Sequence, residues 1–246
     1  MSPTDTAPFV PISASVQRTL AEQAVAALYS RIMSGQLPPG HWLRLAELAD
    51  ELGMSLSPVR EGLRRLETLG LVEIASHRGA RVREVSVDDF EDTQATRRSL
   101  ESLAIRLAAE RFTEADADAA GAALAAHVAH FDRGDQLAAR REHTLFHFAL
   151  YQAGGSKWLL RGIEPVWENS ERYRFTGDPD PEHAAESNRE HMAILEACER
   201  HDADAAVDAL TAHIDRASAR MRHSLDARLS TPEHAPDHSV NERKNQ

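Results

Sequence analysis

The sequence predicts a mainly α-helical chain with two parts, an N-terminal winged helix-turn-helix unit and a C-terminal all-α helical bundle. Three observations lead to this fold class. Before residue 86, helical apolar stripes and turn signals lead into two short alternating runs around "HRG". After residue 87, helical periodicity continues through an alanine-rich stretch without proline until Pro165. Formal charge divides at the same place, because residues 1–85 are neutral and the remainder carries the whole net charge of −11.

The N-terminal unit begins with an amphipathic helix. Its apolar stripe consists of Val16, Leu20, Ala24, Leu28 and Ile32, each four residues from the next. Gly35 and the prolines that follow end this helix, because proline lacks a backbone donor. "HWLRL" is then expected to be extended, and "AELADEL" to form a short helix closed by Gly53.

The stretch "SLSPVREGLRRLETLGLV" predicts the next helix. Ser57 is expected to cap it and Pro58 to occupy its first position, where no donor is needed. "LVEIAS" and "ARVREV" then predict two short strands that form a wing, with Gly79 in the turn between them. Helix, short helix, turn, helix and wing follow one another in the winged helix-turn-helix order.

The second part is expected to contain six helices joined by short turns. They are predicted near residues 88–110, 114–131, 136–153, 156–175, 182–200 and 203–226. The resulting domain prediction is a flexible arm (1–12), a DNA-binding unit (13–86), an effector-binding and dimerisation domain (87–228) and a disordered tail (229–246).

Composition excludes several classes of protein. The single cysteine, Cys198, rules out an intramolecular disulfide and suits a reducing compartment. The N-terminus lacks the basic and apolar regions of a signal peptide, and no segment approaches the roughly 20 apolar residues of a membrane span. We therefore expect a cytoplasmic, nucleoid-associated protein with no membrane partner.

The arginines near residue 60 predict a DNA-binding surface. An arginine on a helix in the major groove can pair with guanine, and arginines on a wing can neutralise phosphates. The alternative is a solvated helix with ordinary surface charge, which the basic wing makes less attractive. The candidate DNA-binding residues are Ser57, Arg60, Arg64, Arg65, His77, Arg78, Gly79 and Arg81. A homodimer would place two such helices on a pseudo-palindromic operator in double-stranded DNA.

Four histidines of the bundle form a candidate metal site. His143 and His147 lie four residues apart on one helix face, a spacing that lets two imidazoles hold one ion. His191 and His213 lie beside core residues on two later helices. In a bundle, metal sites are built from facing helices in this way. The alternative is that these are ordinary buried histidines held by hydrogen bonds.

Three stretches of the sequence resemble a known family. "LRLAELADELGMSLSPVREGLRRLETLGLVEIASHRGARV" is similar to the DNA-binding domain of GntR transcription regulators. "TRRSLESLAIRLAAE" and "EHMAILEACERHDADAAVDALTAHI" resemble the FCD effector domain of the FadR-like branch. In that resemblance Arg60 matches the arginine of the recognition helix. Leu56 stands where many members carry arginine, so the operator sequence of relatives cannot be transferred.

The resemblance also implies a metal and an effector. His147, His191 and His213 match the histidine ligands of FCD domains, and His143 stands where those domains often have aspartate. An all-histidine site favours a divalent transition metal, above all Zn²⁺ or Ni²⁺, over Mg²⁺ or Ca²⁺. Its uncompensated charge should attract a small carboxylate metabolite. The candidate effector-binding residues are Arg98, Asn169 and Arg172. The alternative for Arg98 is a surface ion pair, for example with Glu101 or Glu91.

The sequence therefore predicts a metabolite-responsive transcription regulator, most often a repressor in this family, and not an enzyme. One rival is a hydrolytic metalloenzyme that uses the histidines. Its candidate bases, Glu142 and Glu190, adjoin ligands in sequence and so should point about 100° away from them on the helix. A second rival is a direct metal sensor without an organic effector.

Overall fold

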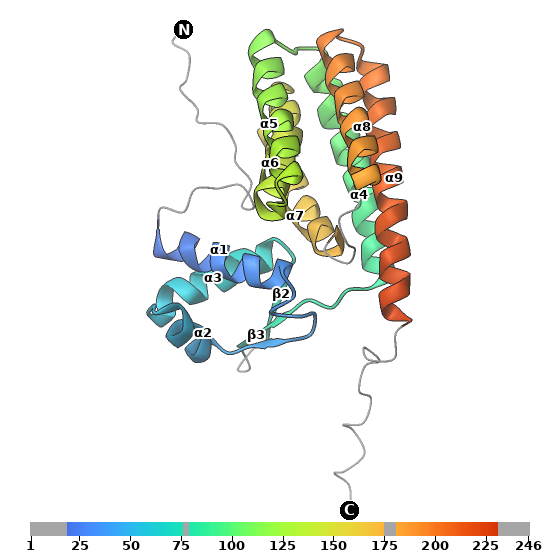
Figure 1. Ribbon diagram of the computed structural model, residues 1–246. Helices are drawn as coiled ribbons and strands as arrows, with labels where there is room; N and C mark the ends of the chain where they lie inside the picture. Colours follow the sequence, from blue (N-terminus) through green and yellow to red (C-terminus); the bar gives the residue numbers. More distant parts are fainter. Residues whose placement is uncertain (1–18, 76–78, 175–180, 231–246) are drawn as a thin grey trace, which may run out of the picture.

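The computed structural model of the chain describes residues 19–75, 79–174 and 181–230. Figure 1 shows a small N-terminal unit below and beside a taller helical bundle. The described elements are α1 (Leu20–Met33), β1 (Trp42–Leu43), α2 (Leu45–Leu52), α3 (Leu56–Thr68), β2 (Val72–Ala75), β3 (Gly79–Val82), α4 (Val87–Ala109), α5 (Glu114–Asp132), α6 (Gln136–Ala153), α7 (Lys157–Arg174), α8 (Pro181–Glu199) and α9 (Ala203–Leu229). The arm predicted at 1–12 and residues 231–246 of the predicted tail lie outside the described residues.

The N-terminal unit has the predicted order of elements around one hydrophobic core. Its sheet has three strands instead of the predicted two, because "HWLRL" contributes β1 and the strand order is β1-β3-β2. Gly79 starts β3 with a φ of 98°, and a Cβ there would lie 2.7 Å from the carbonyl oxygen of Leu43. Only glycine allows β3 to begin so close to β1.

Helix α3 starts earlier than predicted. Ser55 is the residue before its first turn, so the prediction that Ser57 caps the helix is wrong by two positions. Pro58 is tolerated inside the first turn, because the first backbone N–H groups of a helix have no intrahelical acceptor in any case. As a result, Arg60 lies at the start of the second turn and not in the first.

Helix α1 packs directly on α3. A Cβ at Gly62 of α3 would lie 3.2 Å from the Cβ of Ala24 and 3.3 Å from the backbone nitrogen of Val25. The two helix backbones therefore touch, and any displacement of α1 must carry α3 with it. A reciprocal capping box between Thr19 and Glu22 fixes the start of α1.

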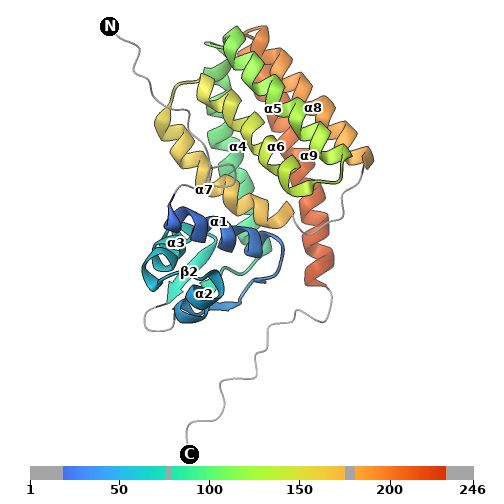
Figure 2. The same cartoon turned by 60° about the vertical axis from the view of Figure 1, so that its left-hand side comes forward.

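The bundle contains helices α4–α9 with bounds close to those predicted (Figure 2). Thr113 and Asp135 cap α5 and α6, and Thr113 forms a capping box with Asp116. Phe146 and Trp167 are fully buried in a core that all six helices share. Nine helices and one small sheet in the described residues confirm the predicted fold class.

The C-terminal end of α7 holds the linker between the two parts. Arg172 donates a 2.9 Å hydrogen bond to the carbonyl oxygen of Arg83, and Asp89 accepts from Tyr173 at 2.6 Å, from Asn169 at 3.1 Å and from Arg172 at 3.2 Å. Burial raises the pKa of Asp89, but these hydrogen bonds and the Arg172 charge outweigh it and hold the pKa below its usual value. Asn169 and Arg172 were predicted to contact the effector. In the structure Arg172 bonds to the linker, and Asn169 bonds to Asp89 and Thr93 of α4.

Candidate functional site

The bundle brings the four predicted histidines together. His143 and His147 come from α6, His191 from α8 and His213 from α9, and all four are buried. Each offers one ring nitrogen, and these four nitrogens lie within 4.8 Å of one another. The Nε2 atoms of His147 and His191 are 3.2 Å apart. Two nitrogens bound to one tetrahedral zinc at about 2.0–2.1 Å would be roughly 3.3 Å apart, so this pair already has the required spacing.

A buried hydrogen-bond chain orients His147. The hydroxyl of Tyr151 donates to Glu101 at 2.6 Å and lies 3.3 Å from Nδ1 of His147. With its proton committed to Glu101, the Tyr151 oxygen can accept from the Nδ1–H of His147, which leaves the Nε2 lone pair facing the cluster. Glu101 is held in turn by Arg97, whose Nε lies 2.6 Å away. Outer partners of this kind fix the tautomer and orientation of metal ligands.

Glu190 orients His213 in the same way. Its Oε2 accepts from Nδ1 of His213 at 2.7 Å, and its Oε1 accepts from Arg216. Glu190 adjoins His191 in sequence, but its carboxylate reaches across to α9. Because both of its oxygens are engaged, Glu190 is a support for a histidine and not a poised general base.

The clustered histidines have the protonation state that metal binding requires. Burial lowers the pKa values of His143, His147 and His191 well below 6.5, and neighbouring histidines lower each of them further. These rings are therefore neutral near pH 7. Among the described residues, the buried Nε2 of His143 and Nδ1 of His191 have no hydrogen-bond partner. A divalent transition metal fits this donor set, because neutral imidazoles with unused lone pairs are its preferred ligands.

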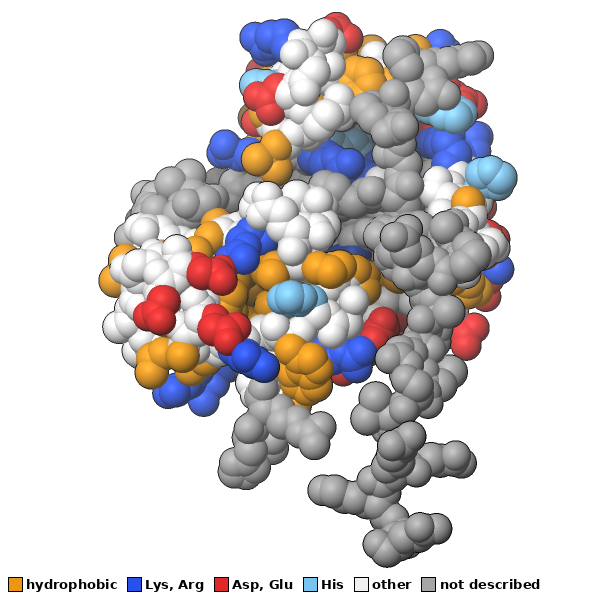
Figure 3. Space-filling view, turned by 60° about the horizontal axis from the view of Figure 1, so that its bottom comes forward, with side chains coloured by type: hydrophobic (Ala, Val, Ile, Leu, Met, Phe, Trp, Pro, Cys, Tyr) orange, Lys and Arg blue, Asp and Glu red, His pale blue; other side chains and the backbone are white. Residues whose placement is uncertain are grey.

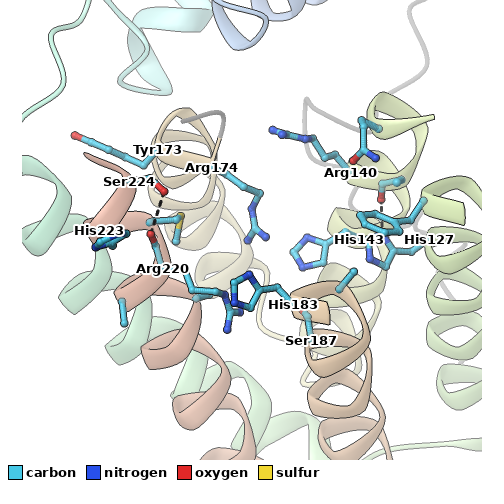
Figure 4. Close-up of a pocket in the computed structure, with 17 residues that line it drawn as sticks. His127, Arg140, His143, Tyr173, Arg174, His183, Ser187, Arg220, His223 and Ser224 are labelled. Carbon is cyan, nitrogen blue, oxygen red and sulfur yellow. Dashed lines mark hydrogen bonds between the residues drawn. The ribbon is translucent and has the colours of Figure 1, made fainter. Parts of the chain in front are cut away.

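A pocket of about 700 Å³ opens beside the histidines (Figure 4). Five helices, α5–α9, contribute side chains to it. His143 of the cluster reaches its wall, and Figure 4 shows Arg174 extending towards that ring from α7. Arg140 and Arg220 add two further guanidinium groups. The positive charge of Arg174 also lowers the pKa values of the clustered histidines, as a nearby cation should.

Sequence reasoning did not select the arginines of this pocket. Arg140, Arg174 and Arg220 occur in ordinary amphipathic helices, where arginine is usually solvated, so no local signal separates them from surface residues. Arg98, which was selected, lies about half exposed on α4 and pairs with Asp215. Its neighbour Arg97 is the one that turns inward. Arg98 therefore forms a surface ion pair, as its alternative interpretation predicts, but with Asp215 as the partner.

The candidate DNA-binding residues fall into two groups. Ser57, Arg60, Arg64 and Arg65 are exposed on α3. Arg64 lies 3.9 Å from Glu61 and Arg65 lies 4.0 Å from Glu22, so both ion pairs are loose. Figure 3 views the N-terminal unit from below and shows Arg and acidic side chains interspersed over that face.

Arg81, in strand β3 of the wing, has closer partners than the arginines of α3. Its Nε donates to the carbonyl oxygen of Gly40 at 2.9 Å, another nitrogen pairs with Glu84, and its guanidinium lies over the ring of Trp42. Arg81 therefore ties β3 to the segment before β1, a structural role that was not predicted. His77 and Arg78 lie outside the described residues.

Comparisons with known proteins agree with both parts. The model of "Bacterial regulatory proteins, gntR family" matches residues 20–82, and the model of the FCD domain matches residues 92–216. The chain belongs to the GntR family, with an FCD effector domain. GntR-family relatives include the "Probable D-xylose utilization operon transcriptional repressor" of Paenarthrobacter nicotinovorans, 33% identical over 201 residues that cover 80% of this chain and 86% of that protein.

Two further similarities support the GntR assignment. The regulator BphR of Paraburkholderia xenovorans is 27% identical over 226 residues, covering 86% of this chain and 89% of BphR. The structure of E. coli McbR/YncC superposes with a TM-score of 0.74 at 25% identity, covering 85% of this chain and all of the other. The relatives are transcriptional regulators. In the described part of this GntR-family chain, no helix is both long and apolar enough to cross a bilayer.

Proposed function

We propose that this GntR-family regulator is a repressor that binds a pseudo-palindromic operator as a homodimer and changes its DNA affinity when a small carboxylate metabolite enters the bundle. The exposed arginines of α3 support the DNA-binding part, with Arg60 reading a base and Arg64 and Arg65 contacting phosphates. A dimer gives each operator two half-site contacts, which raises the affinity far above that of one unit.

The bundle would hold one divalent transition metal through His143, His147, His191 and His213. Zn²⁺ or Ni²⁺ suits four neutral imidazoles best. When bound, such an ion supplies a double positive charge that no protein ligand neutralises. Arg174 and Arg140 extend this positive region into the pocket, so a carboxylate can pair there with guanidinium groups.

The single observation that carries this proposal is the position of His143. It belongs to the histidine cluster and also forms part of the wall of the pocket that Arg140, Arg174 and Arg220 line. A metal site and an anion site thus share one cavity. A direct metal sensor would need no such arginine-lined space, and a hydrolytic enzyme would need a free base near the ion.

Metal content tests the site. Purified wild-type chain and the His213→Ala and His147→Ala variants are incubated with Zn²⁺, passed over a desalting column and subjected to elemental analysis, with Arg98→Ala as the control for an unrelated charge. About one zinc per chain is expected for wild type and the control, and much less for the histidine variants. Folded wild-type chain that takes up no zinc in this assay, and no nickel in the same assay with Ni²⁺, would contradict the proposal.

A further inference from the structure

One tyrosine of the N-terminal unit reaches into the bundle. Tyr29 projects from α1 to α7, two helices that are in contact and lie next to each other in Figures 1 and 2. Its side chain lies close enough to buried Glu168 for the phenol to donate to that carboxylate. Burial, and then the charges of Glu168 and Glu171, raise the pKa of the phenol well above its usual value. Tyr29 therefore stays protonated and remains a hydrogen-bond donor to α7.

Glu168 and Glu171 connect this contact to the effector pocket, and we call these two residues the acid bridge. Glu168 is fully buried and Glu171 is 4% exposed. Glu171 accepts a 2.9 Å hydrogen bond from Nε of Arg174, and its charge also stabilises the charged form of Arg140. Arg140 and Arg174 both line the pocket. The acid bridge thus has Tyr29 on one side and the pocket arginines on the other.

Charge balance makes this arrangement sensitive to an anion. Two buried carboxylates close together are tolerated only with cations nearby, because a buried charge without a partner is strongly unfavourable. Arg140 and Arg174 supply that compensation. A carboxylate in the pocket would compete for the same guanidinium groups, since both ligands offer acceptor oxygens to the same fork of donors.

We propose that the acid bridge is the coupling element between the effector pocket and the DNA-binding unit. This inference rests on the proposed function. An effector carboxylate draws Arg174 and Arg140 away from Glu171, so that Glu171 and Glu168 repel each other and the Tyr29 contact weakens. Because α1 and α3 touch along their backbones at Gly62, loosening α1 from α7 repositions the DNA-reading helix. The effector acts by preferring the state in which this contact is broken.

The test compares full-length wild type, Tyr29→Phe and, as a control, Arg98→Gln, all loaded with Zn²⁺. Tyr29→Phe keeps the ring and removes only the hydroxyl. DNA affinity is measured by fluorescence anisotropy on an operator that wild type selects from a random pool, at constant ionic strength, with and without acetate, lactate, succinate or gluconate. Carboxylate affinity of the DNA-free chains is measured by calorimetry, and zinc content is checked in each.

Wild type and Arg98→Gln are expected to show the same ratio of DNA affinities with and without the active carboxylate. In Tyr29→Phe this ratio should fall towards one, and the affinity without effector should move to the effector-saturated value of wild type. Carboxylate binding should tighten by up to about tenfold, because no hydrogen bond to a charged group has to break. A merely structural role of Tyr29 would not tighten binding.

Two results would overturn the coupling role. One is a wild-type ratio in Tyr29→Phe, and the other is unchanged or weaker carboxylate binding by that variant. Wild-type chain that responds to none of the carboxylates would instead contradict the proposed function, and the coupling role with it. The two failures are therefore distinguishable in one data set.

Discussion

Replacing Tyr151 with phenylalanine should weaken metal binding without touching a ligand. The substitution removes a hydroxyl that donates to buried Glu101 at 2.6 Å and lies 3.3 Å from Nδ1 of His147. Loss of a hydrogen bond to a charged group costs about 1.5–3 kcal/mol of unfolding free energy. For a chain of this length, that lowers the Tm by roughly 3–12 °C. Loss of an outer partner of a ligating histidine typically reduces metal affinity about 10–100-fold.

Tyr173→Phe is the matched control for this prediction. The Tyr173 hydroxyl also donates to a carboxylate at 2.6 Å, but that carboxylate belongs to Asp89, at the start of α4, and not to an outer partner of a clustered histidine. Its loss should lower the Tm of the metal-free chain while leaving zinc affinity at the wild-type value. Zinc affinity is measured by competition with a fluorescent chelator, and Tm by circular dichroism. Equal zinc affinity in wild type and Tyr151→Phe would refute the orienting role of the Tyr151–Glu101 chain.

Three further predictions concern DNA binding, buried charge and pH. Arg60→Ala should weaken binding to the selected operator by about 1–3 kcal/mol and weaken binding to a scrambled duplex by less, and an equal loss of affinity on both duplexes would remove base reading by Arg60. Arg81→Ala should instead lower the Tm, since Arg81 ties the wing to Gly40. Arg97→Gln should lower the free energy of unfolding by about 3–5 kcal/mol, because it leaves buried Glu101 without its cation. Arg98→Gln breaks an exposed ion pair and should change the free energy of unfolding by less than about 1 kcal/mol. Similar values for the two variants in urea unfolding would contradict the burial argument. In the folded chain the pKa values of the buried histidines are depressed below 6.5, so the unfolded chain takes up protons first as the pH falls. The stability of the metal-free chain should therefore be complete above pH 6.5 and fall below it, by up to about 1.4 kcal/mol per pH unit for each such histidine. A flat profile of stability from pH 7 to 5 would exclude this linkage.

Much of the fold follows from local sequence signals. The helices of the bundle lie within a few residues of their predicted bounds, because apolar periodicity and turn residues both mark them. The wing could be placed by Gly79 and its alternating neighbours. The third strand could not, since two residues carry no periodicity. The start of α3 was placed two residues late because Ser55 and Ser57 are both acceptable caps.

Local sequence signals predict the histidines of the candidate site but not its arginines. The histidines could be grouped, because imidazoles four residues apart on an apolar helix face must point inward. The arginines could not, because their roles depend on rotation about the helix axis and on partners distant in sequence. Arg97 and Arg98 differ by about 100° around α4, and Arg172 and Arg174 by about 200° around α7. In each pair the sequence-based choice fell on the residue away from the pocket and the histidines.

The central claim is that the histidine cluster and the arginine-lined pocket form one receptor that controls DNA binding. The most direct test is the operator affinity of wild-type chain in four states: stripped of metal or loaded with Zn²⁺, each with and without the carboxylate. The account predicts that the carboxylate changes the affinity only in the metal-loaded chain. The same affinity in all four states would contradict it, and a response to Zn²⁺ alone would identify a direct metal sensor instead.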